Sequence, residues 1–284
     1  MFLPVFIYVL IVYYWPMLGV RYAFYDYSIK NFEFIGLENF KSMFSTKDFW
    51  RAFSNTLQIS VIKLLITTFT SVLVSVFLNE MGNMFAKKTL QTIIYLPHFM
   101  SWAVVAAIFT LFLSKSSSGF INETLKSWGV ISKSIDFLHS KDWWRPIYYI
   151  INIWKETGWG TVIFLATLSG INPELHEAAV MDGANKYQRV WHIDLPGILP
   201  TVVIMFILSA GKVMTVGFEK AYLMQTSLNI SASEIIATYV YKRGLQQNQF
   251  DFSTAVGLFE SVVNLVMITT VNYLSRKISD SSLF

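Results

Sequence analysis

Six long apolar stretches, separated by polar segments, set the pattern of this chain. A helix needs about 20 mostly apolar residues to cross the hydrocarbon core of a bilayer. The stretches that reach this length lie at about residues 2–22, 56–79, 90–113, 148–169, 198–217 and 253–274. The pattern predicts an all-α, polytopic membrane protein with six transmembrane helices, the third of them kinked at Pro97.

The composition favours the same class. Of the 284 residues, 54% are hydrophobic and 14% are charged, whereas soluble domains carry about 25% charged residues. The first stretch lacks the basic flank and small-residue cleavage site of a signal peptide, so we expect it to be retained as a span. The net charge of +4 includes no basic tract, so no nucleic-acid partner is expected. The absence of cysteine excludes disulfides and thiolate metal sites.

A polar segment at residues 172–196 separates the fourth and fifth stretches and carries strong helix signals. Asn172 is a good N-cap, Pro173 suits the first helical position, and Glu174 favours the positive end of the helix dipole. Asp182 and Gly183 then provide turn chemistry. We expect a second short helix over residues 184–192, ending before Pro196, and therefore a helix-turn-helix elbow.

Enzyme signatures are missing. His176 and Glu177 would need a histidine in place of Val180 to form the zinc-binding H-E-x-x-H motif. Gly211-Lys212 lacks the upstream glycine and the following Ser or Thr of a phosphate-binding loop. The four histidines are scattered over different segments. We therefore expect no catalytic residue, no metal site and no cofactor, and any ATP and Mg²⁺ would be bound by another chain.

Charged residues inside the apolar stretches are costly to insert and tend to face a cavity or a partner. For Lys63 and Lys155, extension of the side chain to the membrane surface is an equal alternative. Lys212 and Glu260 lie near the middle of the fifth and sixth stretches, and we expect them to form an ion pair.

The elbow resembles the cytoplasmic E-A-A loop of bacterial ABC importer permeases. That pattern is E-A-A, three residues, G, nine residues, then I-x-L-P. The matching residues here are Glu177, Ala178, Ala179, Gly183, Ile193, Leu195 and Pro196. Further segments resemble oligosaccharide permeases of the maltose-transporter type, especially those serving complex carbohydrates: residues 15–17, 36–40, 95–98, 158–161 and 239–241.

The resemblance implies a type I ABC importer permease in the bacterial cytoplasmic membrane, a single transmembrane domain over residues 1–284. It also implies a second, similar permease, two ATPase subunits, an extracellular solute-binding protein and an oligosaccharide substrate. The charge distribution does not fix the orientation, so the cytoplasmic place of the loop at 171–197 follows from the resemblance. The residues expected to couple to the ATPase are Glu174, Glu177, Ala178, Ala179, Asp182, Gly183, Ile193, Leu195 and Pro196.

The expected substrate route combines polar groups and aromatic faces at membrane depth. The fourth stretch is interrupted by Glu156 and neighbouring glycines, and such segments are tolerated beside protein or a water-filled cavity. In permeases like this one, sugar contacts lie in the span that follows the E-A-A loop. The candidates are Glu156, Trp159, Ser209, Lys212 and Phe218. The alternative is that Trp159 and Phe218 are interfacial anchors and that Glu260 occupies Lys212.

Two other classes remain open. A secondary transporter or channel for a small polar solute would need ion-coupling residues and often carries an inverted repeat. A membrane enzyme would need titratable groups that converge on one face. Neither feature is visible in the sequence, and dependence of uptake on an ATPase would separate these classes.

Overall fold

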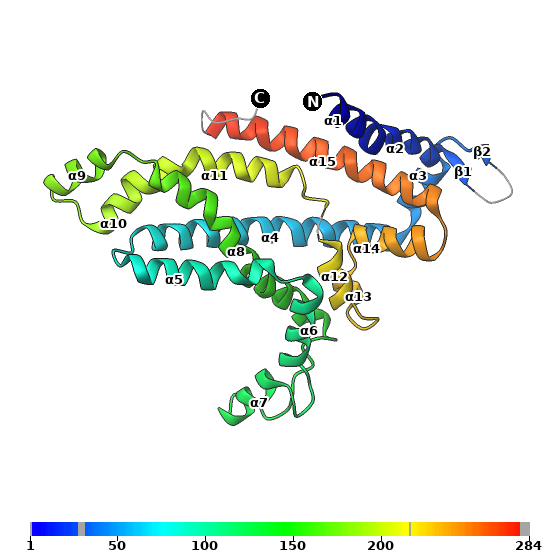
Figure 1. Cartoon of the computed structure of the whole chain (residues 1–284). Coiled ribbons are helices and arrows are strands. Elements are labelled where there is room, and N and C mark those ends of the chain that lie inside the picture. The colour runs from blue at the N-terminus through cyan, green and yellow to red at the C-terminus, as the bar shows by residue number, and fades with distance from the viewer. Residues whose placement is uncertain (1, 28–31, 216, 279–284) are drawn as a thin grey trace.

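Long helices lying side by side form the body of the protein (Figure 1). The computed structural model describes residues 2–27, 32–215 and 217–278. Within these residues, four helices are long and apolar enough to cross a membrane: Phe2–Phe24, Lys47–Asn79, Lys186–Ala210 and Phe250–Lys277. A bent pair of shorter helices makes a fifth candidate. The protein is therefore a mostly helical membrane protein.

The N-terminal helix leads into a small hairpin. It comprises α1 (Phe2–Val9), η1 (Leu10–Tyr14), α2 (Trp15–Met17) and η2 (Leu18–Phe24). Strands β1 (Tyr25–Tyr27) and β2 (Phe32–Phe34) pair antiparallel with Tyr25 opposite Phe34. Alternating aromatic and acidic residues favour such a pair, because rings stack on one face of the two strands. The all-α prediction is wrong for this segment, which α3 (Glu38–Ser45) follows.

Helices α4 (Lys47–Asn79) and α8 (Lys141–Ser169) pack along each other and form the centre of the molecule. Both begin earlier than the apolar pattern predicts, because polar first turns extend them. At the start of α8, Ser140 accepts a hydrogen bond from the amide of Asp142. The polar residues near Glu156 do not break α8, which remains one helix. They do lower its hydropathy, and α8 is not among the candidate spans.

The third apolar stretch is a broken helix. α5 (Met84–Tyr95) and the 3₁₀ turn η3 (Leu96–Phe99) meet α6 (Trp102–Phe112) at 101°. Pro97 cannot donate to the helix, and Ser101 caps a new one by accepting from the amide of Val104. The kink predicted at Pro97 is thus a sharp break, and the bent pair counts as one candidate span. Beyond α6, the short helix α7 (Phe120–Ser127) projects away from the long helices, at the bottom of the view (Figure 1).

The elbow forms one end of the molecule (Figure 1). α9 (Pro173–Met181) begins at the Asn172 cap, as predicted. α10 (Lys186–Arg189) starts at Asn185 and, contrary to the prediction, does not end before Pro196; it continues through the π-helical turn η4 (Val190–Asp194) into α11 (Leu195–Ala210). The π-helical turn lies directly before Pro196, whose ring has no N–H to donate to a regular helix.

The segment after α11 folds back into the molecule rather than forming a polar connector. The fifth apolar stretch ends its helix at Ala210, seven residues before the predicted limit of 217. The elements that follow are α12 (Phe218–Met224), α13 (Ile230–Ser233), α14 (Ile236–Val240), η5 (Tyr241–Gln246) and α15 (Phe250–Ile278). Ile235 and Ile236 are fully buried, and Glu234 pairs with Arg51 of α4 and Lys242 of η5.

Candidate functional site

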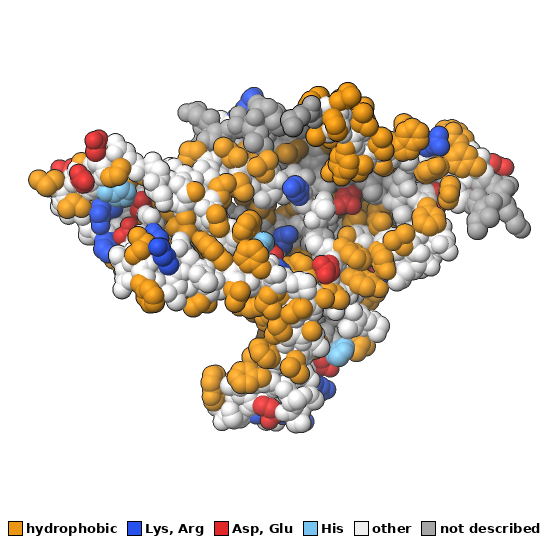
Figure 2. All heavy atoms as spheres, in the orientation of Figure 1, with side chains coloured by type: hydrophobic (Ala, Val, Ile, Leu, Met, Phe, Trp, Pro, Cys, Tyr) orange, Lys and Arg blue, Asp and Glu red, His pale blue; other side chains and the backbone are white. Residues whose placement is uncertain are grey.

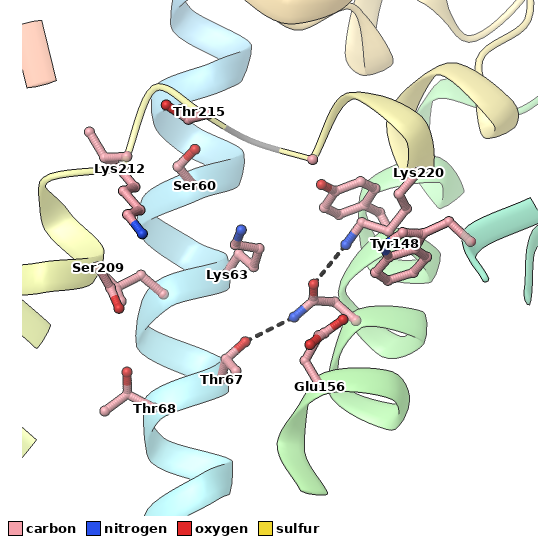
Figure 3. A pocket seen from close by; sticks show the side chains of 15 residues that line it. Ser60, Lys63, Thr67, Thr68, Tyr148, Glu156, Ser209, Lys212, Thr215 and Lys220 are labelled. Atoms are coloured by element: carbon pink, nitrogen blue, oxygen red, sulfur yellow. Dashed lines mark hydrogen bonds between the residues drawn. The ribbon is translucent and has the colours of Figure 1, made fainter. Parts of the chain in front are cut away.

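A cavity of about 410 Å³ lies between α4, α8, α11 and α12 (Figure 3). Its walls come from segments far apart in the sequence, brought together by the packing of α8 along α4. The lining residues are Ser60, Lys63, Leu64, Thr67, Thr68, Trp102, Tyr148, Asn152, Glu156, Ser209, Lys212, Val213, Thr215, Gly217 and Lys220.

Three lysines from three different elements line this cavity: Lys63 on α4, Lys212 just after α11, and Lys220 on α12 (Figure 3). Lys220 is only 3% exposed. Its ammonium group lies 3.5 Å from the centre of the Tyr148 ring and donates to Asn152 Oδ1 at 2.7 Å. A cation–π contact and a hydrogen bond thus hold this buried cation in place.

Hydroxyl and amide groups complete the polar lining. Asn152 Nδ2 donates to Thr67 Oγ1 at 2.9 Å, which links Lys220 through Asn152 to α4 (Figure 3). Ser60, Thr68, Ser209 and Thr215 add further hydroxyls. Such groups both donate and accept hydrogen bonds, and they suit the hydroxyls of a sugar.

Glu156 supplies the one carboxylate among the described lining residues. Its Oε2 lies 3.0 Å from His98 Nδ1, and its Oε1 lies 3.9 Å from Lys155 Nζ. Lys155 is buried and donates to the carbonyl of His98 at 2.6 Å, at the break between α5 and α6. Extension of Lys155 to the membrane surface is therefore wrong. Glu156 is already engaged at this break, and lysines outnumber carboxylates three to one among the described lining residues.

The structure brings three of the five predicted path residues into this cavity: Glu156, Ser209 and Lys212. Trp159 stacks on His98 with ring centres 4.7 Å apart and lines a neighbouring cavity that shares Ser209. Phe218 lines another cavity of about 620 Å³, with Glu260, Tyr241 and Phe250 among its residues.

The predicted ion pair between Lys212 and Glu260 is wrong. No such pair occurs among the described residues, and the two side chains line different cavities. The cavities meet at Thr215 and Gly217, which line both. Sequence reasoning also missed Lys220, Asn152 and Thr67. Lys220 lies in a segment that reads as a polar connector, and nothing in its local sequence indicates burial.

The elbow exposes most of the predicted coupling residues. Glu174, Glu177, Ala178, Asp182, Gly183 and Pro196 are exposed, whereas Ala179, Ile193 and Leu195 are half-buried. Gly183 has φ +80°, a conformation that glycine adopts without penalty, and the space where a Cβ would lie is open. Figure 2 shows acidic and basic side chains gathered at this end of the molecule.

Large apolar side chains accompany these charges at the elbow. Met181 and Tyr187 are each 87% exposed, and Trp191 is 69% exposed. Phe85, at the start of α5, is 81% exposed. An exposed apolar group of this kind, rimmed by charges, is typical of a protein-binding surface. No three potential His, Cys, Asp or Glu metal ligands gather anywhere in the described part of the chain.

Comparisons with known proteins agree on one family. Residues 71–280 match the family described as binding-protein-dependent transport system inner membrane component. Protein LplB of Bacillus subtilis (strain 168) is 42% identical over 99% of this chain and 89% of its own length. The polygalacturonan/rhamnogalacturonan transport system permease protein YteP of the same organism is 39% identical over 100% and 89%.

Solved structures give the same result. The chain is similar to one in a crystal structure of a bacterial alginate ABC transporter in complex with alginate pentasaccharide-bound periplasmic protein. The TM-score is 0.92 at 37% identity, covering 100% of this chain and 95% of the other. A second crystal structure, of a bacterial ABC transporter involved in the import of the acidic polysaccharide alginate, matches with a TM-score of 0.91 at 38% identity, covering 98% and 94%.

Proposed function

Because the chain belongs to the family of binding-protein-dependent transport system inner membrane components, we propose that its lysine-lined cavity is part of a route for acidic oligosaccharides. The protein is a multi-pass inner-membrane permease subunit of an ABC importer for polysaccharide or oligosaccharide substrates, and ATP is hydrolysed by a separate subunit. The finer proposal concerns the charge of the sugar and the way ATP drives its movement.

The observation that carries the substrate proposal is the set of three lysines around one cavity. Lys63, Lys212 and Lys220 surround it, and Glu156 is the one carboxylate among its described lining residues. Lysines at membrane depth are costly and tend to mark a substrate or ion pathway. The carboxylates of a uronate chain would meet these ammonium groups, while the hydroxyls of Thr67 and Ser209 would bind the neutral parts of each ring.

The relatives support the same substrate class. One is named for polygalacturonan and rhamnogalacturonan transport, and one similar structure is described as importing an acidic polysaccharide. Both polygalacturonan and rhamnogalacturonan contain galacturonate, so their fragments carry one negative charge for each acidic ring. A cavity with excess positive charge complements fragments of this kind.

We propose that the chain forms one transmembrane domain of six spans over residues 1–284, with α8 and the broken α5–α6 segment among them. The elbow at 171–197 would then face the cytoplasm. The partners would be a second, similar permease, two ATPase subunits, an extracellular solute-binding protein and the surrounding lipid. One of the similar structures is a bacterial alginate ABC transporter in complex with an alginate pentasaccharide-bound periplasmic protein. That complex supports this arrangement.

We further propose that ATPase closure reaches the cavity through the elbow. The exposed Glu174, Glu177 and Gly183, with Ala178, Ala179 and Asp182, would form the docking surface. Ile193, Leu195 and Pro196 lie in the continuous helix that runs from η4 into α11. Ser209 on α11, and Lys212 just beyond it, line the cavity. Movement of the elbow would therefore alternate the access of the cavity to the two sides.

The test compares an acidic with a neutral sugar. Lys63→Met and Lys212→Met are assembled with their partner subunits in proteoliposomes, and uptake of oligogalacturonate and of a neutral oligosaccharide of equal length is measured. Each variant should lower oligogalacturonate uptake by about tenfold, equivalent to about 1.4 kcal/mol, and should change neutral uptake much less. Lys115→Met, an exposed lysine outside the cavity, is the matched control. An equal loss for both sugars in the cavity variants would refute an anion-binding role.

A further inference from the structure

One ion pair joins the two arms of the elbow. His176 on α9 places its Nε2 3.3 Å from Oδ1 of Asp194 in η4. Asp194 is 1% exposed, and within the described residues no hydrogen bond reaches either of its carboxylate oxygens. His176 keeps 25% of its side chain exposed, so protons can reach it from solvent.

His176 is the side chain that can compensate this buried carboxylate at close range. A buried carboxylate is costly unless a positive group or hydrogen bonds compensate it. The other charged side chains that act on Asp194 are Arg189 of α10, which is favourable, and Glu80 at the end of α4, which is unfavourable. A positive side chain at position 176 balances the charge of Asp194, whereas a neutral side chain there can at most donate a hydrogen bond.

The remaining side-chain hydrogen bonds of the elbow stay within one arm. Asn172 caps the start of α9, Asn185 and Gln188 cap α10, and His192 contacts the carbonyl of Gln188. At the turn, the amide of Ala184 donates to Ala179. Among the described side chains, the pair of His176 with Asp194 is thus the polar contact that ties α9 to the helix leading into α11.

We propose that His176 and Asp194 form a charged clasp that transmits movement of α9 to α11. With the clasp closed, α9 and the start of α11 move together; with it open, the elbow flexes and ATP hydrolysis proceeds with less transport. His176 is a positioning residue that acts through Asp194. This inference rests on the proposed coupling role of the elbow.

The test measures ATP hydrolysed per sugar imported, in the assembled importer. His176→Gln, which cannot carry a positive charge, should raise this ratio several-fold. His176→Lys, which keeps a positive charge, should hold the low wild-type ratio. His176→Gln with Asp194→Asn should recover part of the coupling, because no buried charge is left unpaired.

His139→Gln is the matched control, since His139 pairs with Asp136 at 2.8 Å outside the elbow and its replacement should leave the ratio of ATP to sugar unchanged. Thermal unfolding in detergent checks that each variant is folded. If His176→Gln keeps the wild-type ratio while uptake remains driven by ATP, the clasp is refuted and the proposed function stands. If the wild-type chain shows no ATP-driven uptake with its partners, the proposed function and the clasp fall together.

Discussion

Gly158 shows at the scale of single residues why the polar interruption of α8 is structural as well as functional. A Cβ at this position would lie 2.1 Å from the carbonyl oxygen of Ile94 on α5. Glycine therefore lets α8 approach the backbone of α5, beside the break where Lys155 donates to the carbonyl of His98. From sequence alone, this glycine reads as a gap in an apolar run.

We expect Gly158→Ala to destabilise the protein by about 1–3 kcal/mol, because the added methyl group would force α8 away from α5. The measurement is thermal unfolding in detergent. Gly257→Ala in α15 is the control, since a Cβ there meets nothing within 4 Å. It should be neutral or stabilise by up to about 1 kcal/mol through helix propensity. Equal effects of the two substitutions would contradict the close approach.

At the scale of elements, local signals predict the elbow and the position of the break at Pro97, but not how distant segments pack around that break. The cap at Asn172 and the turn at Gly183 depend on a few neighbouring residues, and the structure has both. The donation of the buried Lys155 of α8 to the broken helix, and the burial of Lys220 of α12 against Tyr148 and Asn152, come from distant segments. Such contacts join residues far apart in the sequence, and no local pattern carries them.

The turn of the elbow provides an element-scale prediction. Gly183 has φ +80° and open space around its Cβ position, so Gly183→Asp adds bulk and charge at the docking surface with no clash inside the chain. We expect it to abolish ATPase association and uptake while the permease remains in the membrane. Co-purification of the ATPase subunits measures the association.

Gly129→Asp is the control for backbone strain. Gly129 has φ +72° and equally open space, but it lies after α7, outside the elbow. Both substitutions carry a similar strain of about 1–2 kcal/mol. Gly129→Asp should therefore bind the ATPase and transport as the wild type does. Normal ATPase binding by Gly183→Asp would refute the docking role of this turn.

At the scale of the whole molecule, the charged side chains meet around the cavity only because the fold brings distant segments together. Its three lysines and one glutamate come from segments that the sequence places up to 157 residues apart, at Lys63 and Lys220. Sequence reasoning found Glu156 and Lys212 because each places a charge in an apolar run, and Ser209 from the family resemblance. It could not predict that Lys220 joins them, and it paired Lys212 with Glu260, which lines a different cavity.

Glu156 is then expected to weaken the affinity of the cavity for acidic sugars. Its carboxylate offsets part of the lysine charge and repels the carboxylates of a substrate in the same space. Glu156→Gln keeps a side chain that can contact His98 and removes the negative charge. The KM for oligogalacturonate uptake should fall several-fold, while the KM for a neutral oligosaccharide should stay within about twofold.

Glu260→Gln, in the neighbouring cavity, is the control and should leave the ratio of the two KM values unchanged. An unchanged ratio in Glu156→Gln as well would mean that substrate carboxylates do not enter the lysine-lined cavity.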